Sequence, residues 1–127
     1  MEADRPHVSE ELNEAAEPAT PRPAATVLLL RGGSETLEVL LVKRNPDRGF
    51  MAGAWVFPGG SVENAEGSGD AAHRVAAVRE LEEEASVTIA DPSELVAFSR
   101  WITPAMVKKR FDTWFYLAHA PGDAAPK

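Results

Sequence analysis

The sequence predicts an α+β domain, in which several short β-strands are combined with one long α-helix. Runs rich in branched and aromatic residues recur between glycines and prolines, which is typical of strands separated by turns. One continuous segment of alanine, leucine and glutamate favours a helix. The length of 127 residues and the hydrophobic content of 44% fit one domain with a single core.

The first 23 residues are predicted to be a disordered tail, and residues 24–127 to be the folded domain. Acidic residues and prolines dominate the tail, whereas its apolar residues are few and show no period. Such a segment cannot bury enough surface to offset the entropy that ordering would cost.

The domain is predicted to begin with a β-hairpin. Its strands are Ala25–Arg31 and Leu37–Arg44, and Gly32-Gly33-Ser34 forms the turn between them. A loop follows over residues 45–52, because asparagine, proline, aspartate and glycine cluster there.

The rest of the chain is predicted to alternate between short strands and loops around one helix. Ala54–Phe57 is a short strand that ends at the turn Pro58-Gly59-Gly60, and Ser61–Gly69 is a polar loop. Three further strands are expected after the helix: Ser86–Ala90, Leu95–Ile102 and Arg110–Ala118.

The clearest element is a helix from Asp70 to Ala85, with Asp70 as its N-cap. On a wheel of about 100° per residue, one side carries an apolar stripe that we expect to be buried. This stripe consists of Val75, Val78, Leu81 and Ala85. Another side carries three glutamates within an arc of about 100°. These are Glu80, Glu83 and Glu84.

The three glutamates have two interpretations. A run of acidic residues commonly forms a solvated helix face. However, neighbouring carboxylates repel one another, and a bound hard cation reverses that cost. Mg²⁺ takes oxygen ligands and keeps some of its waters, which suits a few carboxylates together with substrate phosphates. Arg79 lies beside Glu83 on the wheel and could hold a carboxylate through a bidentate pair.

Together with the segment Trp55–Gly60, which alone has an ordinary structural interpretation, this helix resembles the Nudix box, Gx5Ex7REUxEExGU. Gly60 and Glu66 have the Gx5E spacing, and residues Arg79–Val87 follow REUxEExGU with one change. That change is Ser86, which stands where the box has glycine. In addition, twelve residues instead of seven separate Glu66 from Arg79, so that Glu63 could take the place of Glu66.

The resemblance implies an α/β/α sandwich around a mixed sheet. It also implies that Glu80, Glu83 and Glu84 bind Mg²⁺ or Mn²⁺. The implied catalytic residues are Glu83, Glu80, Glu66 and Arg79, and the implied substrate-binding residues are Arg44, Arg48, Gly59 and Gly60. For the arginines, a solubilising role at a strand end is an equal alternative. The general base stays open among Glu63, Glu66 and a helix glutamate.

The implied activity is hydrolysis of a diphosphate in a nucleoside diphosphate linked to another group. The stretches around residues 39–44, 53–60 and 99–104 look like the branch that contains peroxisomal coenzyme A diphosphatases, so coenzyme A or acyl-coenzyme A is the leading substrate. The alternatives are a nucleotide-binding or inactive Nudix module and a purely structural acidic protein. The Nudix fold continues with another strand and a C-terminal helix, for which residues 119–127 leave no room. We therefore expect association, as in a homodimer, or low stability.

Charge and composition limit the classes of molecule that the protein is expected to bind. A net charge of −7 argues against binding to nucleic acid polymers, since these require a basic surface. The longest apolar run is far shorter than a membrane span, and no signal peptide is evident. The absence of cysteine excludes disulfides and thiolate chemistry. We expect a cytoplasmic protein that acts on a small nucleotide-derived molecule.

Overall fold

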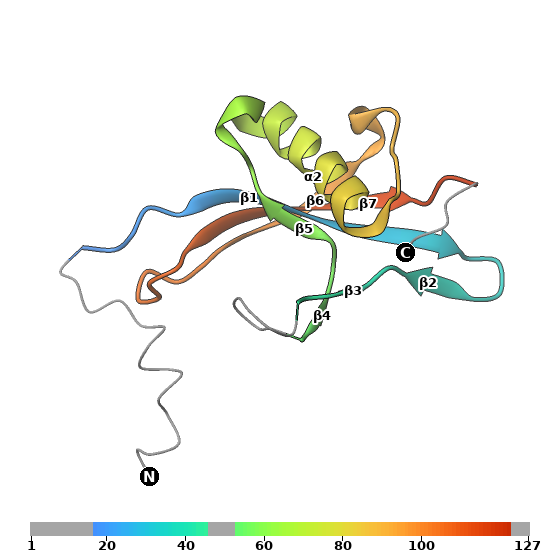
Figure 1. Ribbon diagram of the computed structural model, residues 1–127, viewed down its shortest axis with the longest axis horizontal. Coiled ribbons are helices and arrows are strands. Elements are labelled where there is room, and N and C mark those ends of the chain that lie inside the picture. Colours follow the sequence, from blue (N-terminus) through green and yellow to red (C-terminus); the bar gives the residue numbers. More distant parts are fainter. Residues whose placement is uncertain (1–16, 46–52, 123–127) are drawn as a thin grey trace, which may run out of the picture.

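The computed structural model describes residues 17–45 and 53–122 (Figure 1). Its main sheet has the strand order β2-β1-β7-β6, and β5 pairs with β1 beside this path. The strands are β1 (Arg22–Gly32), β2 (Leu37–Val39), β5 (Gly59–Ser61), β6 (Val96–Ile102) and β7 (Phe111–His119). β1 and β7 are parallel and the other pairs are antiparallel, so the sheet is mixed as expected.

β1 lies at the centre of the sheet. It begins at Arg22, three residues before the predicted strand, because β7 supplies parallel partners as far as the pair Arg22 and Phe111. Arg22 and Pro23, which the sequence assigned to the tail, therefore belong to this strand. The predicted hairpin turn after β1 is confirmed, since Gly32 and Gly33 both have positive φ. Residues 1–16 of the predicted tail lie outside the described residues.

The second predicted strand, Leu37–Arg44, is divided into two. β2 pairs with the end of β1, and Leu40 N–H still donates to Leu29 O. The chain then leaves the main sheet, and β3 (Val42–Lys43) pairs with β4 (Trp55–Val56) instead. This two-stranded ribbon lies on the side of the sheet opposite the helix (Figure 1).

The segment predicted to be a Pro-Gly-Gly turn is instead a strand. β5 runs antiparallel to β1, and neither Gly59 nor Gly60 has a positive φ. At Gly59 the reason for glycine is close approach, because a Cβ there would overlap the backbone of Ala25 and Thr26. The partner strand, and not the local sequence, imposes the extended conformation.

The predicted helix is present as α2 (Gly69–Ala85), which covers one face of the sheet (Figure 1). The N-cap is Ser68 and not Asp70, because Asp70 lies in the first turn, where it bonds to Arg74 and accepts from the Tyr116 hydroxyl. Burial raises the pKa of Tyr116 to about 12, so its proton stays in place to anchor the helix to β7.

The buried face of α2 differs from the predicted stripe. Val75 is 43% exposed and Val78 only partly buried, whereas alanines make most of the contact. The buried residues are Ala72, His73, Ala76, Ala77, Leu81 and Ala85. Small side chains allow the helix to lie close to the sheet. Since Ala76 and Ala77 lie on the same side of the wheel as Glu80 and Glu84, these glutamates are at the margin of the buried face, not on a separate solvated one.

The helix ends at Ser86, which has φ 59° and ψ 31° and is the non-glycine residue with positive φ among those described. The predicted strand Ser86–Ala90 is absent. Val87 and Ile89 pack into the core without a strand partner in the described part of the chain, and a short 3-10 helix, η3 (Pro92–Glu94), follows.

Ser86→Gly is expected to raise the free energy of unfolding by about 0.5–1 kcal/mol. The left-handed conformation costs an L-residue roughly 1–2 kcal/mol, and the larger entropy of glycine in the unfolded chain offsets part of that gain. Urea denaturation of the two proteins would measure the difference. Ser86→Ala, which has no relief of strain, serves as the control. Equal stability of wild type and Ser86→Gly would show that Ser86 is not strained.

The last two strands match their predictions to within one residue at each end. β6 and β7 form an antiparallel pair with a register shift between Ala97 and Ser99. On the face away from α2, the apolar side chains of Val96, Phe98 and Trp101 are exposed. Within residues 17–45 and 53–122, a helix covers one face of the sheet only, and no helix there is long and apolar enough to cross a membrane.

Candidate metal and substrate site

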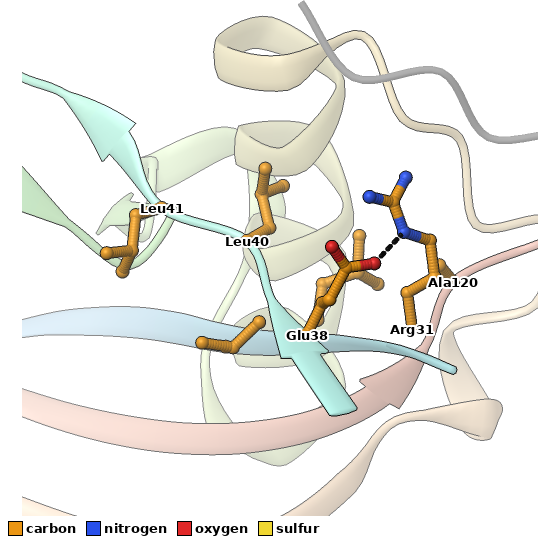
Figure 2. Close-up of a pocket in the computed structure, with 7 residues that line it drawn as sticks. Arg31, Glu38, Leu40, Leu41 and Ala120 are labelled. Atoms are coloured by element: carbon orange, nitrogen blue, oxygen red, sulfur yellow. Dashed lines mark hydrogen bonds and ion pairs between the residues drawn. The ribbon is translucent and has the colours of Figure 1, made fainter. Parts of the chain in front are cut away.

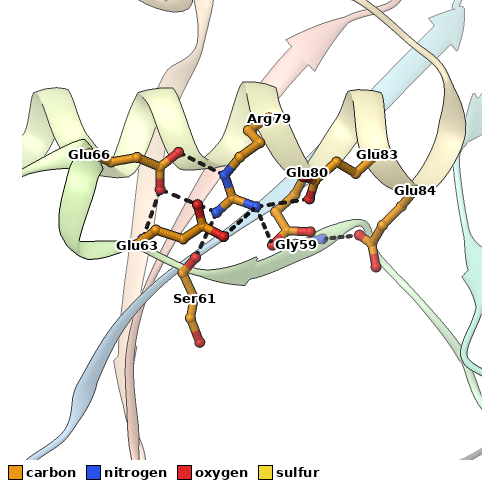
Figure 3. A network of polar contacts seen from close by, with 8 residues as sticks. All are labelled: Gly59, Ser61, Glu63, Glu66, Arg79, Glu80, Glu83 and Glu84. Carbon is orange, nitrogen blue, oxygen red and sulfur yellow. Dashed lines mark hydrogen bonds and ion pairs between the residues drawn. The ribbon is translucent and has the colours of Figure 1, made fainter.

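The glutamates of α2 lie along strand β5 (Figure 3). The Gly59 N–H donates to Glu84 Oε1 over 2.9 Å, and Gly60 contacts the Glu80 carboxylate so closely that a Cβ at Gly60 would overlap it. Both glycines thus contact the helix glutamates directly. One supplies a backbone donor, and the other leaves room for a carboxylate.

Arg79 is the centre of the polar network. Its Nη1 donates to Glu80 Oε2 (3.0 Å) and to Glu83 Oε1 (2.9 Å), and its Nη2 donates to the Ser61 carbonyl (2.9 Å). Figure 3 shows the guanidinium between the helix and the loop that precedes it. Arg79 therefore holds two of the three predicted metal ligands and ties the helix to the end of β5.

The bidentate partner of Arg79 is Glu66, not Glu83. Arg79 Nε and Nη2 donate to the two Glu66 oxygens over 2.8 and 3.2 Å, whereas the nearest Glu63 oxygen is 3.8 Å from Nη1. Glu66 ends a short 3-10 helix, η2 (Asn64–Glu66), and also accepts from Glu63 N–H. The longer loop thus brings Glu66, in preference to Glu63, against the arginine.

The electrostatics of the helix glutamates favour an added cation. Burial raises the pKa values of Glu80 and Glu84, and repulsion from neighbouring glutamates raises them further, against the opposing effect of Arg79 and of Gly59 N–H. By contrast, the hydrogen bonds from Arg79 hold the pKa of Glu66 below its usual range. A divalent cation beside Glu80 and Glu84 would favour their charged forms.

The three glutamates do not converge on one point in this conformation. Within the part of the chain that the structure describes, no three acidic or histidine side chains form a set that could hold a metal ion. Arg79 draws Glu80 and Glu83 toward Glu66, while Gly59 holds Glu84. Glu83 and Glu84 are exposed at the residue level, so rotation of their side chains could bring the oxygens together.

A cleft of about 730 Å³ is lined by one of these glutamates, Glu84. Of the predicted substrate-binding residues, Arg44, Gly59 and Gly60 line it together with Glu84, and Arg48 lies outside the described residues. Lys43, Phe57 and Phe111 also line the cleft. From the sequence, Lys43 could contact a phosphate, and Phe111 is one of several late-strand aromatic residues that could stack on a base, whereas Phe57 was not among the candidates. The signal for Phe111 was its place on a late strand, but only the strand register shows which aromatic residue reaches the cleft.

A second cavity, of about 340 Å³, lies at the other end of β1 and is lined by Leu29, Leu40 and Ala120 among others. Arg31 and Glu38 form an ion pair beside it (Figure 2). Both partners are more than half exposed, so the pair contributes little to stability. No helix glutamate lines this cavity.

Gly60→Ala is expected to weaken Mn²⁺ binding about tenfold, since groups that only orient metal ligands typically contribute 10- to 100-fold to affinity. The added methyl would push the Glu80 carboxylate aside, and the flexible side chain would yield without unfolding the domain. Calorimetric titration with Mn²⁺ would measure the change. Gly122→Ala is the matched control, because a Cβ there meets nothing within 4 Å. Equal affinity in the two variants would contradict this role for Gly60.

The mixed sheet, the glycine strand and the glutamate helix give the arrangement expected from the resemblance to the Nudix box. The chain belongs to the Nudix family, since residues 20–127 match the family model described as NUDIX domain. It is similar to "Putative nudix hydrolase 7" of Caenorhabditis elegans, with 31% identity over 130 residues. That match covers 76% of this chain and 43% of the relative, so the chain spans less than half of that protein's length.

Solved structures agree on the fold. The NUDIX hydrolase of Alicyclobacillus acidocaldarius matches with a TM-score of 0.76 at 23% identity, over 86% of this chain and 74% of that one. The NUDIX domain of NrtR from Shewanella oneidensis, solved with ADP ribose, matches with a TM-score of 0.64 at 18% identity, over 98% and 73% of the two chains. These similarities confirm the predicted fold class.

Proposed function

We propose that this domain catalyses divalent-metal-dependent hydrolysis of a diphosphate linkage in a nucleoside diphosphate joined to another group. The main support is the position of Glu80 and Glu84 against β5, where Gly60 contacts Glu80 and the Gly59 N–H binds Glu84 beside an open cleft; burial raises the pKa values of both carboxyl groups. Membership of the Nudix family supports the same reaction class.

In this proposal Glu80, Glu83 and Glu84 hold Mg²⁺ or Mn²⁺. When bound, the ions would neutralise the diphosphate and lower the pKa of an attacking water. Arg79 keeps Glu80 and Glu83 at the surface of the helix that faces β5. The candidates for the base that takes the proton of water are Glu66, Glu63 and a helix glutamate. Because Arg79 engages both Glu66 oxygens but only one oxygen each of Glu63, Glu80 and Glu83, these residues and Glu84 are favoured over Glu66.

The substrate is held by groups that line the cleft. Arg44 faces Glu84 and forms no ion pair with a described residue, so it is available for a phosphate. We place Arg48 with it as a second phosphate contact. Gly59 and Gly60 contribute β5 to the lining of the cleft. Coenzyme A or acyl-coenzyme A is the leading candidate, on the basis of the sequence resemblance around residues 39–44, 53–60 and 99–104.

A nucleotide-binding module without turnover is the alternative. The observation that favours it is the left-handed Ser86 at the helix end, where the Nudix box has glycine. The intact set of Glu80, Glu83 and Glu84 favours catalysis. The NrtR domain is solved with ADP ribose, so this compound belongs among the ligands to be tested.

The test is product analysis by mass spectrometry after incubation with Mg²⁺ or Mn²⁺. The panel contains coenzyme A, acetyl-coenzyme A, ADP-ribose, NADH, diadenosine tetraphosphate and 8-oxo-dGTP. We expect 4′-phosphopantetheine and adenosine 3′,5′-bisphosphate from coenzyme A, and no product once a chelator is added. Cleavage of another compound would keep the reaction class and correct the substrate. Metal-dependent binding without any product would support the binding module.

We also propose that the chain associates with a second copy. The support is the exposed apolar side chains of β6, of which Trp101 is 67% exposed and Val96 58%. Sedimentation at increasing protein concentration is expected to show a dimer. A stable monomer at all concentrations would refute this.

A further inference from the structure

The substrate cleft lies on the face of the sheet opposite α2. In β1, Ala25 and Val27 are fully buried toward the helix, so Ala24 and Thr26, which line the cleft, point to the other face. In β7, Tyr116 and Ala118 are in the same core, so Phe111 also points away from α2. The cleft therefore runs from Glu84 around β5 to the far face of the sheet.

The register of the strands gives the length of this cleft. Gly59 pairs with Thr26, which in turn pairs with Phe115, so Gly59 and Phe115 lie in one row, two strand spacings of about 5 Å apart. Phe111 is four residues further along β7, or about 13 Å. The two ends of the cleft, marked by Gly59 with its bound Glu84 and by Phe111, are thus separated by roughly 16 Å.

The chemistry changes along this length. At the Gly59 end the lining is charged, with Glu84 and Arg44 close enough to interact. Toward the sheet, the wall of the cleft is apolar and includes Val56, Phe57 and Phe111. A diphosphate alone is shorter than the cleft. A ligand that fills it needs a phosphate end and, on an extended arm, a flat apolar group.

We propose that Phe111 is a specificity-determining residue that binds the nucleobase of the substrate, on the sheet face opposite the metal-binding helix. The proposal rests on the proposed diphosphatase function, and it assigns positions in the cleft to the diphosphate, the ribose and the base. The diphosphate stays at Glu80, Glu83 and Glu84, the ribose passes along β5, where Gly59 and Gly60 line the cleft, and the base stacks on Phe111.

Phe111 is well suited to this test because its backbone is held independently of its side chain. Its N–H donates to Thr103 Oγ1 and its carbonyl accepts from Thr103 N–H, both over 3.0 Å. Truncation of the ring therefore leaves the strand end in place. Phe98 supplies a matched control, since it is an exposed aromatic residue on β6 that does not line the cleft and contacts Phe115 instead.

The experiment compares calorimetric binding of ADP and of inorganic pyrophosphate in the presence of Mn²⁺, for wild type, Phe111→Ala, Phe111→Leu and Phe98→Ala. ADP carries a base and pyrophosphate does not. Phe111→Ala is expected to weaken ADP binding about tenfold, because loss of one base–aromatic stack typically has an effect of this order. Pyrophosphate binding should stay unchanged, Phe111→Leu should be intermediate, and Phe98→Ala should match wild type. Thermal unfolding of each variant verifies the fold.

Three outcomes are distinguishable. A selective loss of ADP binding in Phe111→Ala supports the proposal. Equal losses for ADP and pyrophosphate, or no loss, overturn it while the diphosphatase proposal stands. If wild type binds neither compound with Mn²⁺ and cleaves nothing in the substrate panel, the proposed function fails, and the role of Phe111 fails with it.

Discussion

Glu83→Gln is expected to lower the metal-dependent turnover number by at least about 100-fold. Loss of a group that only orients a metal ligand typically costs 10- to 100-fold, so loss of a ligand charge should cost no less. Fold and stability should change little, because the Glu83 side chain is 58% exposed and its contact is the arginine of the same helix turn. Steady-state kinetics with saturating Mn²⁺ would measure the effect.

Glu82→Gln is the matched control for this prediction. Glu82 is on the same helix and is also exposed, but its polar contact is with the Thr88 hydroxyl and not with Arg79. Its turnover number should match that of wild type. Wild-type rates in Glu83→Gln would refute the helix as the metal site. Equal losses in both variants would point to a general effect of acidic charge.

Arg79→Met is expected to lower the free energy of unfolding by about 3 kcal/mol at neutral pH. Removing one partner of a buried ion pair typically costs 3–5 kcal/mol, because the other charge is left without compensation. Here the stranded carboxylates are Glu66 and Glu80, whose side chains are only 9% and 15% exposed. Arg31→Met is the control, since both partners of the Arg31–Glu38 pair are largely exposed and its loss should change the free energy of unfolding little.

The same variant should change the dependence of stability on pH. Arg79 holds the pKa of Glu66 below its usual range, so the folded pKa lies below the unfolded value of about 4.3. This contribution is therefore present above the unfolded pKa and is lost as the pH falls through the folded pKa. Urea titrations between neutral and acid pH should show a shallower acid loss in Arg79→Met. An unchanged slope, or a loss as small as in Arg31→Met, would contradict the central role of Arg79.

Local patterns were sufficient for the elements whose signal lies in their own residues. The helix that carries Glu80, Glu83 and Glu84 begins within one residue of its predicted start, and the late strands match equally well. The spacing of the glutamates on a helix follows from its geometry alone. These features depend on neighbours in sequence, so one sequence could reveal them.

The features that were missed depend on partners distant in sequence. Strand β5 consists of Gly59, Gly60 and Ser61, which have no strand signal of their own, and it is extended because β1 pairs with it. The prediction of which face of α2 is packed was wrong. Small alanines pack against the sheet, and a pattern based on hydrophobicity alone does not identify them. Likewise, Phe111 reaches the cleft through the register of β1 and β7.

The choice between Glu66 and Glu63 also required the structure. Both lie in a loop whose length departs from the Nudix box, so that spacing alone could not decide which one meets Arg79. The 3-10 helix Asn64–Glu66 turns Glu66 back toward the guanidinium. The roles of these residues in catalysis stay predictions until the variants are measured.

The parallel pairing of β1 with β7 has a consequence for how the chain folds. Arg22 and Phe111 are neighbours in the sheet although they lie near opposite ends of the described chain. The hairpin of β1 with β2 and the helix α2 can form from local contacts. The pairing of β1 with β7 at the centre of the sheet instead requires closure of a loop that spans almost the whole domain. During synthesis, the nascent chain would carry its glutamate helix and a central strand, β1, whose β7 edge is unpaired until β7 leaves the ribosome. β7 thus completes both the core and the cleft after the other described elements have been made, and the chain is prone to aggregate in that interval.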